Sequence, residues 1–104
     1  MRSNLQVTKK QFSVLVVDDE PANIDLLSGI LGAFYDIKVA PSGKIALKIV
    51  KKYTPDLILL AVMMPEMDGF EVCRKLKSDK RLLDIPVMFV TALIQEADEA
   101  RDFA

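Results

Sequence analysis

Two adjacent aspartates, Asp18 and Asp19, directly follow an apolar run at residues 14–17. Adjacent carboxylates repel each other, and a hard cation such as Mg²⁺ relieves that repulsion with oxygen ligands while keeping several waters. Two further predicted strands end near Ala61 and Thr91. Because ligands bind at the carboxyl ends of parallel strands, these residues are predicted to share one site. A simpler interpretation is that the acidic pair only caps the helix that follows.

The centre of this predicted site is chemically inert. Ala61 can neither bind a metal nor attack a substrate, although it lies at the predicted carboxyl end of the strand formed by the longest apolar run. The sequence contains no histidine, which excludes His-based acid–base catalysis and His-ligated zinc. The single cysteine, Cys73, excludes an internal disulfide and fits a reducing compartment. The pattern therefore indicates an acidic site without an evident nucleophile at its middle position.

Four segments are predicted to be the strands that position these residues: three apolar runs at 14–17, 57–63 and 85–90, and an alternating segment at 36–40. Seven unbroken apolar residues at 57–63 are typical of a strand covered on both faces. The alternation at 36–40 indicates a strand near a sheet edge. Amphipathic segments lie between the runs, so the order is β-α-β-α-β-α-β-α. This order predicts an α/β fold with a parallel sheet and right-handed crossovers.

The helices are predicted from proline, capping residues and apolar spacing. Pro21 suits a first helical turn, and Ser42 can cap the second helix. The expected inner residues are Ile24, Leu27, Ile30 and Leu31, then Ile45, Ala46, Ile49 and Val50, then Phe70, Cys73 and Leu76. The expected solvated residues are Lys44, Lys48, Lys51, Lys52, Arg74, Lys75 and Lys77. Met63, Met64 and Met67 are expected to pack inside, and a further helical segment is expected from Glu96 onward.

Length and composition predict one globular domain. The chain has 104 residues, of which 51% are apolar and 28% charged. Its 14 basic and 15 acidic residues give a net charge of −1, so no global field favours nucleic acid or a membrane as partner. No apolar run approaches a membrane span, and the polar N-terminus does not resemble a signal peptide. We expect a cytoplasmic protein with a lead-in at residues 1–11 and a domain at 12–104.

Three motifs carry a resemblance to a known family. They are VLVVDDEP at residues 14–21, PDLILLAVMMPEMDGFEV at 55–72 and IPVMFVTA at 85–92. At this spacing the chain resembles the receiver domain of two-component response regulators. The resemblance implies a three-layer, flavodoxin-like, doubly wound parallel sheet with strand order 2-1-3-4-5. It also implies a phosphorelay role, in which a histidine kinase passes a phosphoryl group to an aspartate with the help of Mg²⁺.

The resemblance assigns a role to each matching residue of this sequence. Asp18 and Asp19 match the acidic pair that holds Mg²⁺, Asp19 directly and Asp18 largely through water. Met63 matches the position whose backbone carbonyl is a metal ligand. Thr91 matches the hydroxyl residue that bonds the phosphoryl group and shifts on activation.

Two departures from the family pattern change the expected function. Ala61 stands where the family has its phosphoacceptor aspartate, and a methyl group can neither form an acylphosphate nor bind the metal. Mg²⁺ binding is therefore expected to be weak or absent. The chain as given also stops before the fifth strand and helix, so a truncated receiver with strand order 2-1-3-4, lacking the family's lysine, is expected. Whether Ala61 and the end at Ala104 are natural or engineered stays open.

Three functions of different classes remain as hypotheses. The first is a non-enzymatic signalling module that cannot be phosphorylated and that binds a histidine kinase or other two-component proteins. The second is a Mg²⁺-dependent phosphoryl-transfer or phosphatase domain with Asp18 as nucleophile and Asp19 as acid–base partner. The third is a homodimer or larger oligomer, formed through an exposed edge of the strand at 85–90. The cognate kinase and the output domain stay undetermined.

Overall fold

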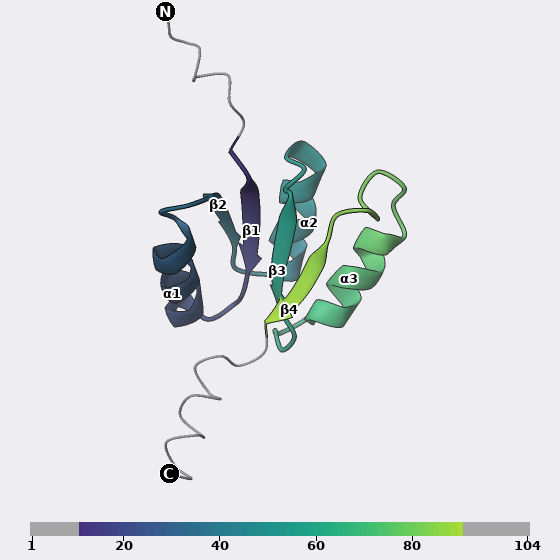
Figure 1. Cartoon of the computed structure of the whole chain (residues 1–104). Helices are drawn as coiled ribbons and strands as arrows, with labels where there is room; N and C mark the ends of the chain where they lie inside the picture. Colours follow the sequence, from purple (N-terminus) through teal and green to yellow (C-terminus); the bar gives the residue numbers. More distant parts are fainter. Residues whose placement is uncertain (1–10, 91–104) are drawn as a thin grey trace, which may run out of the picture.

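The computed structural model describes residues 11–90, and Thr91 and the segment expected from Glu96 lie outside this range. Strands and helices alternate along the described chain, as the sequence predicted (Figure 1). Their bounds are β1 (Ser13–Val17), α1 (Pro21–Leu31), β2 (Asp36–Ala40), α2 (Gly43–Lys52), β3 (Leu57–Ala61), α3 (Gly69–Lys77) and β4 (Val87–Val90). None of the helices found within residues 11–90 has the length and apolar character needed to cross a membrane.

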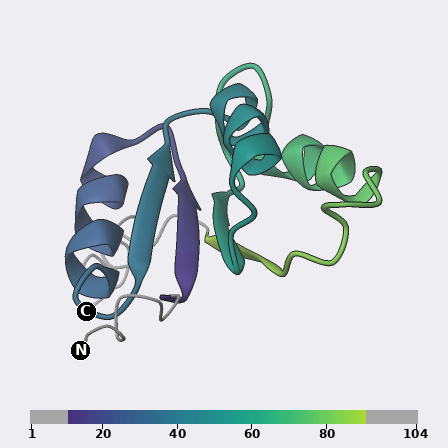
Figure 2. The same ribbon diagram turned by 90° about the horizontal axis from the view of Figure 1, so that it is seen from above.

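All strand pairs are parallel, and the strand order is β2-β1-β3-β4. The order reverses between β1 and β3, so the first crossover runs one way along the sheet and the later ones run the other way. Figure 2 shows α1 against one face of the sheet and α2 and α3 against the other. The fold is therefore the three-layer, flavodoxin-like α/β arrangement, and that prediction is confirmed. The edge position predicted for β2 is also confirmed.

The core has two parts because alternate residues of a strand point to opposite faces of a sheet. The larger part lies between the sheet and the α2–α3 layer, and it includes Leu15, Val17, Ala40, Ala46, Val50, Ile58, Leu60, Ala61, Met64, Val72, Leu76, Leu82 and Ile85. The smaller part contains Val14, Val16 and Leu59, covered by partly buried residues of α1. No residue of α1 is itself buried. The α1 face of the sheet is thus the more thinly covered of the two.

Several expected inner residues are exposed in the structure, so those predictions were wrong. Ile30 is 56% exposed and Ile45 is 40% exposed. Met63 is 83% exposed, although Met64 beside it is buried. On α3 the buried stripe is Val72 and Leu76. Phe70 is displaced to the flank of the helix, where its ring lies 5.1 Å from that of Phe89 on β4.

Polar side chains close the loops that connect these elements. Ser42 accepts a hydrogen bond from the Ile45 amide at 3.2 Å, which confirms the predicted cap of α2. Asp68 caps α3 in the same way through the Glu71 amide. Lys77 was expected to be only solvated, but its ammonium group donates to two carbonyl groups of the loop before β4. These bonds hold the chain in place where it enters and leaves the helices.

Candidate functional site

The carboxyl ends of the central strands meet at one edge of the sheet, and this edge contains the predicted site. The register pairs Val17 of β1 with Ala40 of β2 and with Leu60 of β3, so Asp18 and Ala61 each follow a paired position. The Asp18 amide extends the ladder by donating to the Ala40 carbonyl at 3.1 Å. The structure therefore brings Asp18 and Ala61 to the same edge, as the sequence predicted.

Asp18 is the one buried charged or polar residue in the described range, with 4% of its surface exposed. Its Oδ1 accepts a hydrogen bond from the Glu20 amide at 2.9 Å, and its Oδ2 accepts one from Nδ2 of Asn23 at 3.0 Å. Two donors at the start of α1 thus compensate the loss of water around the carboxylate. Pro21 starts the helix, which brings the Asn23 amide back over the end of β1.

Asn23 is a site residue that the sequence analysis missed. The available signal was its position in the first turn of α1, directly after the acidic run. The simple capping interpretation of the acidic residues is also only partly right. The N-cap residue of α1 is Glu20, whose side chain forms no cap, and Asp18, two residues earlier, instead accepts a hydrogen bond from the Glu20 amide.

Asp19 is exposed, in contrast to its buried neighbour. The two carboxylates therefore differ in their access to solvent, although they are adjacent in the sequence. An exposed carboxylate can contact a hydrated cation directly, whereas each oxygen of Asp18 already accepts one hydrogen bond from the start of α1. The division of metal-binding roles between the two aspartates stays a prediction.

Ala61 is buried, with 6% exposure, and its backbone is covered by the start of α3. A β-carbon on Gly69 would overlap the Ala61 carbonyl oxygen and would lie 3.0 Å from its carbonyl carbon. The Gly69 amide donates to the Val62 carbonyl at 2.9 Å. The loop between β3 and α3 therefore folds back tightly over position 61, and it contains Glu66 with a positive φ of 69°.

The donors available to a metal at this edge are few. Within residues 11–90, no group of three or more His, Cys, Asp or Glu side chains is placed to hold a metal ion. The acidic pair supplies two carboxylates, and Ala61 supplies no side-chain oxygen. Met63 lies in the loop after β3, and only its backbone carbonyl could contribute. Thr91, the remaining predicted site residue, lies outside the described residues.

Comparisons with known proteins agree with this geometry. The family described as "Response regulator receiver domain" matches residues 14–103. The response regulator PleD of Caulobacter vibrioides is 50% identical over 86 residues, which are 82% of this chain and 19% of that protein. A "Probable cyclic di-GMP phosphodiesterase" of Vibrio cholerae is 44% identical over 93 residues, which are 89% of this chain and 21% of that protein.

A solved structure is similar over most of the chain. It is the N-terminal domain of a response regulator receiver protein from Methanoculleus marisnigri, with a TM-score of 0.77 and 36% identity, and it covers 90% of this chain and 77% of that one. The chain spans about one fifth of the length of the two curated relatives named above. About four fifths of each of those longer proteins lies outside the matched region, so their activities are not assigned to this chain.

Proposed function

The chain belongs to the response regulator receiver domain family, and we propose that it is a receiver that does not accept a phosphoryl group. Receiver domains work in two-component signalling, where they interact with histidine kinases and bind Mg²⁺ in an acidic pocket. One observation carries the proposal: the residue at the carboxyl end of β3, beside Asp18, is Ala61. This chain would then signal through protein contacts alone.

The chemistry of position 61 supports this proposal. Formation of an acylphosphate requires a carboxylate oxygen as nucleophile, and the alanine methyl group offers none. Asp18 is a poor substitute because both of its oxygens accept hydrogen bonds and its side chain is buried. The same observation weighs against a phosphoryl-transfer enzyme with Asp18 as nucleophile.

We also propose that Mg²⁺ binding is weak. Asp18, Asp19 and the Met63 carbonyl would hold the ion, and its chemistry there would be to neutralise the acidic edge of the sheet. The chain's own residues would orient it: Asn23 and the Glu20 amide hold Asp18 in place, while exposed Asp19 meets the hydrated ion. Isothermal titration is expected to give tighter Mg²⁺ binding for Ala61→Asp than for the wild type, since the variant adds a third carboxylate.

A phosphorylation assay tests the main proposal. The wild type and Ala61→Asp are incubated with acetyl phosphate and Mg²⁺, and intact mass is measured before and after hydroxylamine, which cleaves acylphosphates. A receiver that is known to be phosphorylated verifies the reagent in parallel. We expect no hydroxylamine-labile phosphoryl group on the wild type. Labelling of the wild type that disappears in Asp18→Asn would refute the proposal and support the enzymatic hypothesis.

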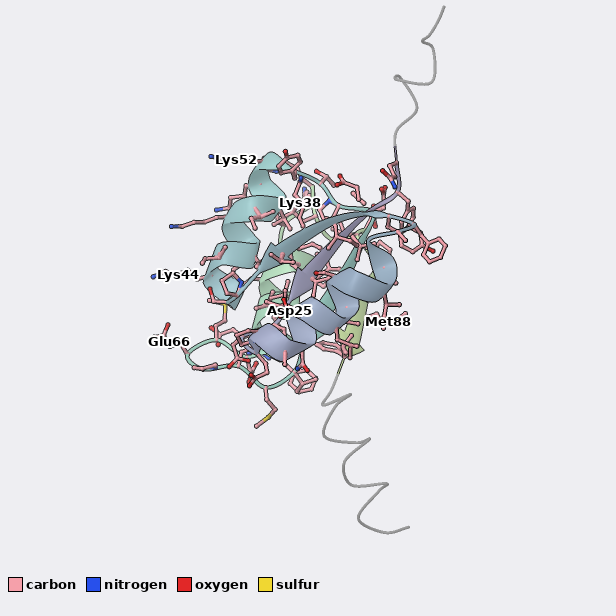
Figure 3. All side chains as sticks on the ribbon, turned by 90° about the vertical axis from the view of Figure 1, so that its left-hand side faces the viewer. Asp25, Lys38, Lys44, Lys52, Glu66 and Met88 are labelled. Atoms are coloured by element: carbon pink, nitrogen blue, oxygen red, sulfur yellow. The ribbon has the colours of Figure 1, made fainter. Side chains whose placement is uncertain are left out.

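A second candidate function, self-association, rests on the exposed side of β4. Among residues 11–90, β4 pairs with β3 alone. Met88 is 56% exposed and Phe89 38% exposed, and Figure 3 shows Met88 at the margin of the molecule. A groove of about 680 Å³ lies beside this strand, between α1 and the sheet. An exposed apolar edge strand is a template for pairing with a second chain.

Sedimentation equilibrium over a wide concentration range tests this second candidate. We expect the wild type to form a homodimer or larger oligomer, and we expect Met88→Lys to shift it toward the monomer, because a charge on an edge strand opposes pairing. Lys80→Met, which makes the reverse change at an exposed position of the connection between α3 and β4 and outside the strand edge, is the control. A wild type that is monomeric at every concentration would rule this function out.

A further inference from the structure

The outer side of α2 carries four lysines and no acidic residue. Lys44, Lys48, Lys51 and Lys52 are all exposed, and their spacing places them along one side of the helix. At 1.5 Å per residue this stripe is about 12 Å long. Figure 3 shows Lys44 and Lys52 near opposite ends of α2, with their side chains extending away from the ribbon.

Ordinary helix electrostatics explains only half of this stripe. Lys51 and Lys52 lie in the last turn of α2, where a cation is favoured by the helix dipole. Lys44 lies in the first turn, where a cation is disfavoured, and that turn contains no acidic residue. Lys48 stands four residues from both Lys44 and Lys52, an arrangement in which like charges repel. Ion pairs do not relieve this repulsion, because none of the four lysines forms one with a residue in the range 11–90. Lys51 does interact electrostatically with Asp79, but that carboxylate is already paired with Arg81.

Exposed apolar groups accompany the lysines. Ile45 is 40% exposed and Tyr53, at the end of the helix, is 56% exposed. Lys38, on the adjacent edge strand β2, places its ammonium group 4.4 Å from the centre of the Tyr53 ring. An aromatic and apolar centre with a polar rim is typical of protein interfaces, and here the rim is supplied by lysines. We call this surface the α2 basic face; it comprises Lys38, Lys44, Ile45, Lys48, Lys51, Lys52 and Tyr53.

We infer that the α2 basic face docks an acidic protein segment, one that places carboxylates against the lysines and an apolar side chain against Ile45. This inference is independent of the phosphorylation state and of the β4 edge, which lies at the other end of the sheet. Charge complementarity is the main argument, since the chain has a net charge of −1 and yet concentrates positive charge on this face. An acidic partner would relieve the repulsion within the stripe.

The surroundings of the face favour a protein segment over a nucleic acid. The loop that contains exposed Glu66 and Asp68 lies beside the start of α2, where a β-carbon on Gly43 would lie 3.1 Å from the Met67 sulfur. Figure 3 shows Glu66 beyond the Lys44 end of the helix. A phosphate backbone is uniformly negative, and one that continues past Lys44 would meet these carboxylates. A protein segment can confine its negative charge to a stripe of about 12 Å.

Binding of poly-L-glutamate, measured by fluorescence anisotropy at low salt, tests the inference. The variant K44Q/K48Q/K52Q is compared with the control R74Q/K75Q/K80Q, which removes the same charge from exposed positions on and after α3. We expect the α2 variant to lose about tenfold in affinity and the control to lose much less, because three surface ion pairs are removed in one case only. We also expect the wild-type affinity to fall as salt is raised.

Two further measurements separate the alternatives. The copolymer of glutamate and tyrosine is expected to bind more tightly than poly-L-glutamate, and Ile45→Ser is expected to abolish that difference alone. Absence of wild-type binding, or equal losses in the two triple variants, would overturn the inference. Tighter binding of a DNA duplex than of either polymer would replace the acidic protein with a nucleic acid and would also overturn it.

Discussion

The contact between Gly69 and Ala61 leads to a prediction of how much stability is lost when a β-carbon is placed against the backbone at the end of β3. Gly69 begins α3 and has no positive φ, so its backbone conformation does not itself require glycine. A β-carbon there would overlap the Ala61 carbonyl oxygen and would lie 3.1 Å from the α-carbon of Val62. These are backbone atoms of a buried strand end, and they cannot rotate away as a flexible side chain could. Gly69→Ala must therefore displace α3 from β3.

The magnitude follows from two opposing effects. Overpacking of this kind typically costs about 1–3 kcal/mol, and displacement of α3 would also weaken the hydrogen bond from Gly69 to Val62, which contributes about 1 kcal/mol. The higher helix propensity of alanine returns about 0.5–1 kcal/mol. We expect a net loss of about 1–3 kcal/mol in the free energy of unfolding. For a domain of this size, that corresponds to a fall in Tm of roughly 5–20 °C.

Gly29→Ala is the matched control, since it makes the same chemical change in α1. A β-carbon at Gly29 has no atom within 4 Å, so only the helix-propensity term remains. We expect this variant to be more stable by about 0.5–1 kcal/mol. Urea titration and thermal melting, both followed by circular dichroism, measure the two changes. The reasoning is refuted if Gly69→Ala is as stable as the wild type, or if both variants shift in the same direction.

Three other changes test the acidic edge and the loop after α3. Ala61→Asp would bury a carboxylate beside buried Asp18, so in EDTA its unfolding free energy should fall by about 1–3 kcal/mol, and an equal or higher Tm would contradict this. Asp18→Ala leaves the Glu20 amide and Asn23 without their acceptor, so the unfolding free energy measured by urea titration should fall by about 1–3 kcal/mol. A loss below about 0.5 kcal/mol, on the order of a surface substitution, would show that water replaces the carboxylate as acceptor. The hydrogen bond from the Arg81 side chain lowers the pKa of Asp79 below its ordinary value of 3.8, so the pair's contribution to stability is present above pH 3.8 and is lost as the pH falls through the lower folded-state pKa. Arg81→Gln should raise the pKa of Asp79 toward 3.8 in an NMR titration of its carboxyl group, and an unchanged pKa would exclude the Arg81 side chain as the cause.

Much of the fold could be predicted from local patterns. The alternation at residues 36–40 identified β2 with its observed bounds, and the unbroken apolar run from Leu57 identified a buried central strand. Such patterns show which sides of a segment are apolar, and this depends only on the segment's own residues. The strand order 2-1-3-4 came from the resemblance to receiver domains, because hydrophobic periodicity does not specify which strands are neighbours.

Packing between distant segments decided the points where the prediction failed. Phe70 fits the apolar spacing of α3, yet it lies against Phe89 on β4 while Val72 faces the core. Met63 and Met64 are indistinguishable by residue type, and the turn after β3 exposes one and buries the other. In each case the outcome depends on where a second element lies, and this information is absent from the spacing within one element.

The sequence by itself determined the chemistry that the site can offer. It specified an acidic pair after β1, the absence of histidine, and a methyl group where the resemblance implies an acceptor carboxylate. Only the tertiary structure distinguished the two aspartates, since it buries Asp18 under donors from Glu20 and Asn23 and leaves Asp19 exposed. It also revealed that Gly69 closes over Ala61. Residue type sets which atoms are available for chemistry, whereas their burial and partners depend on how chain segments that are distant in sequence approach one another.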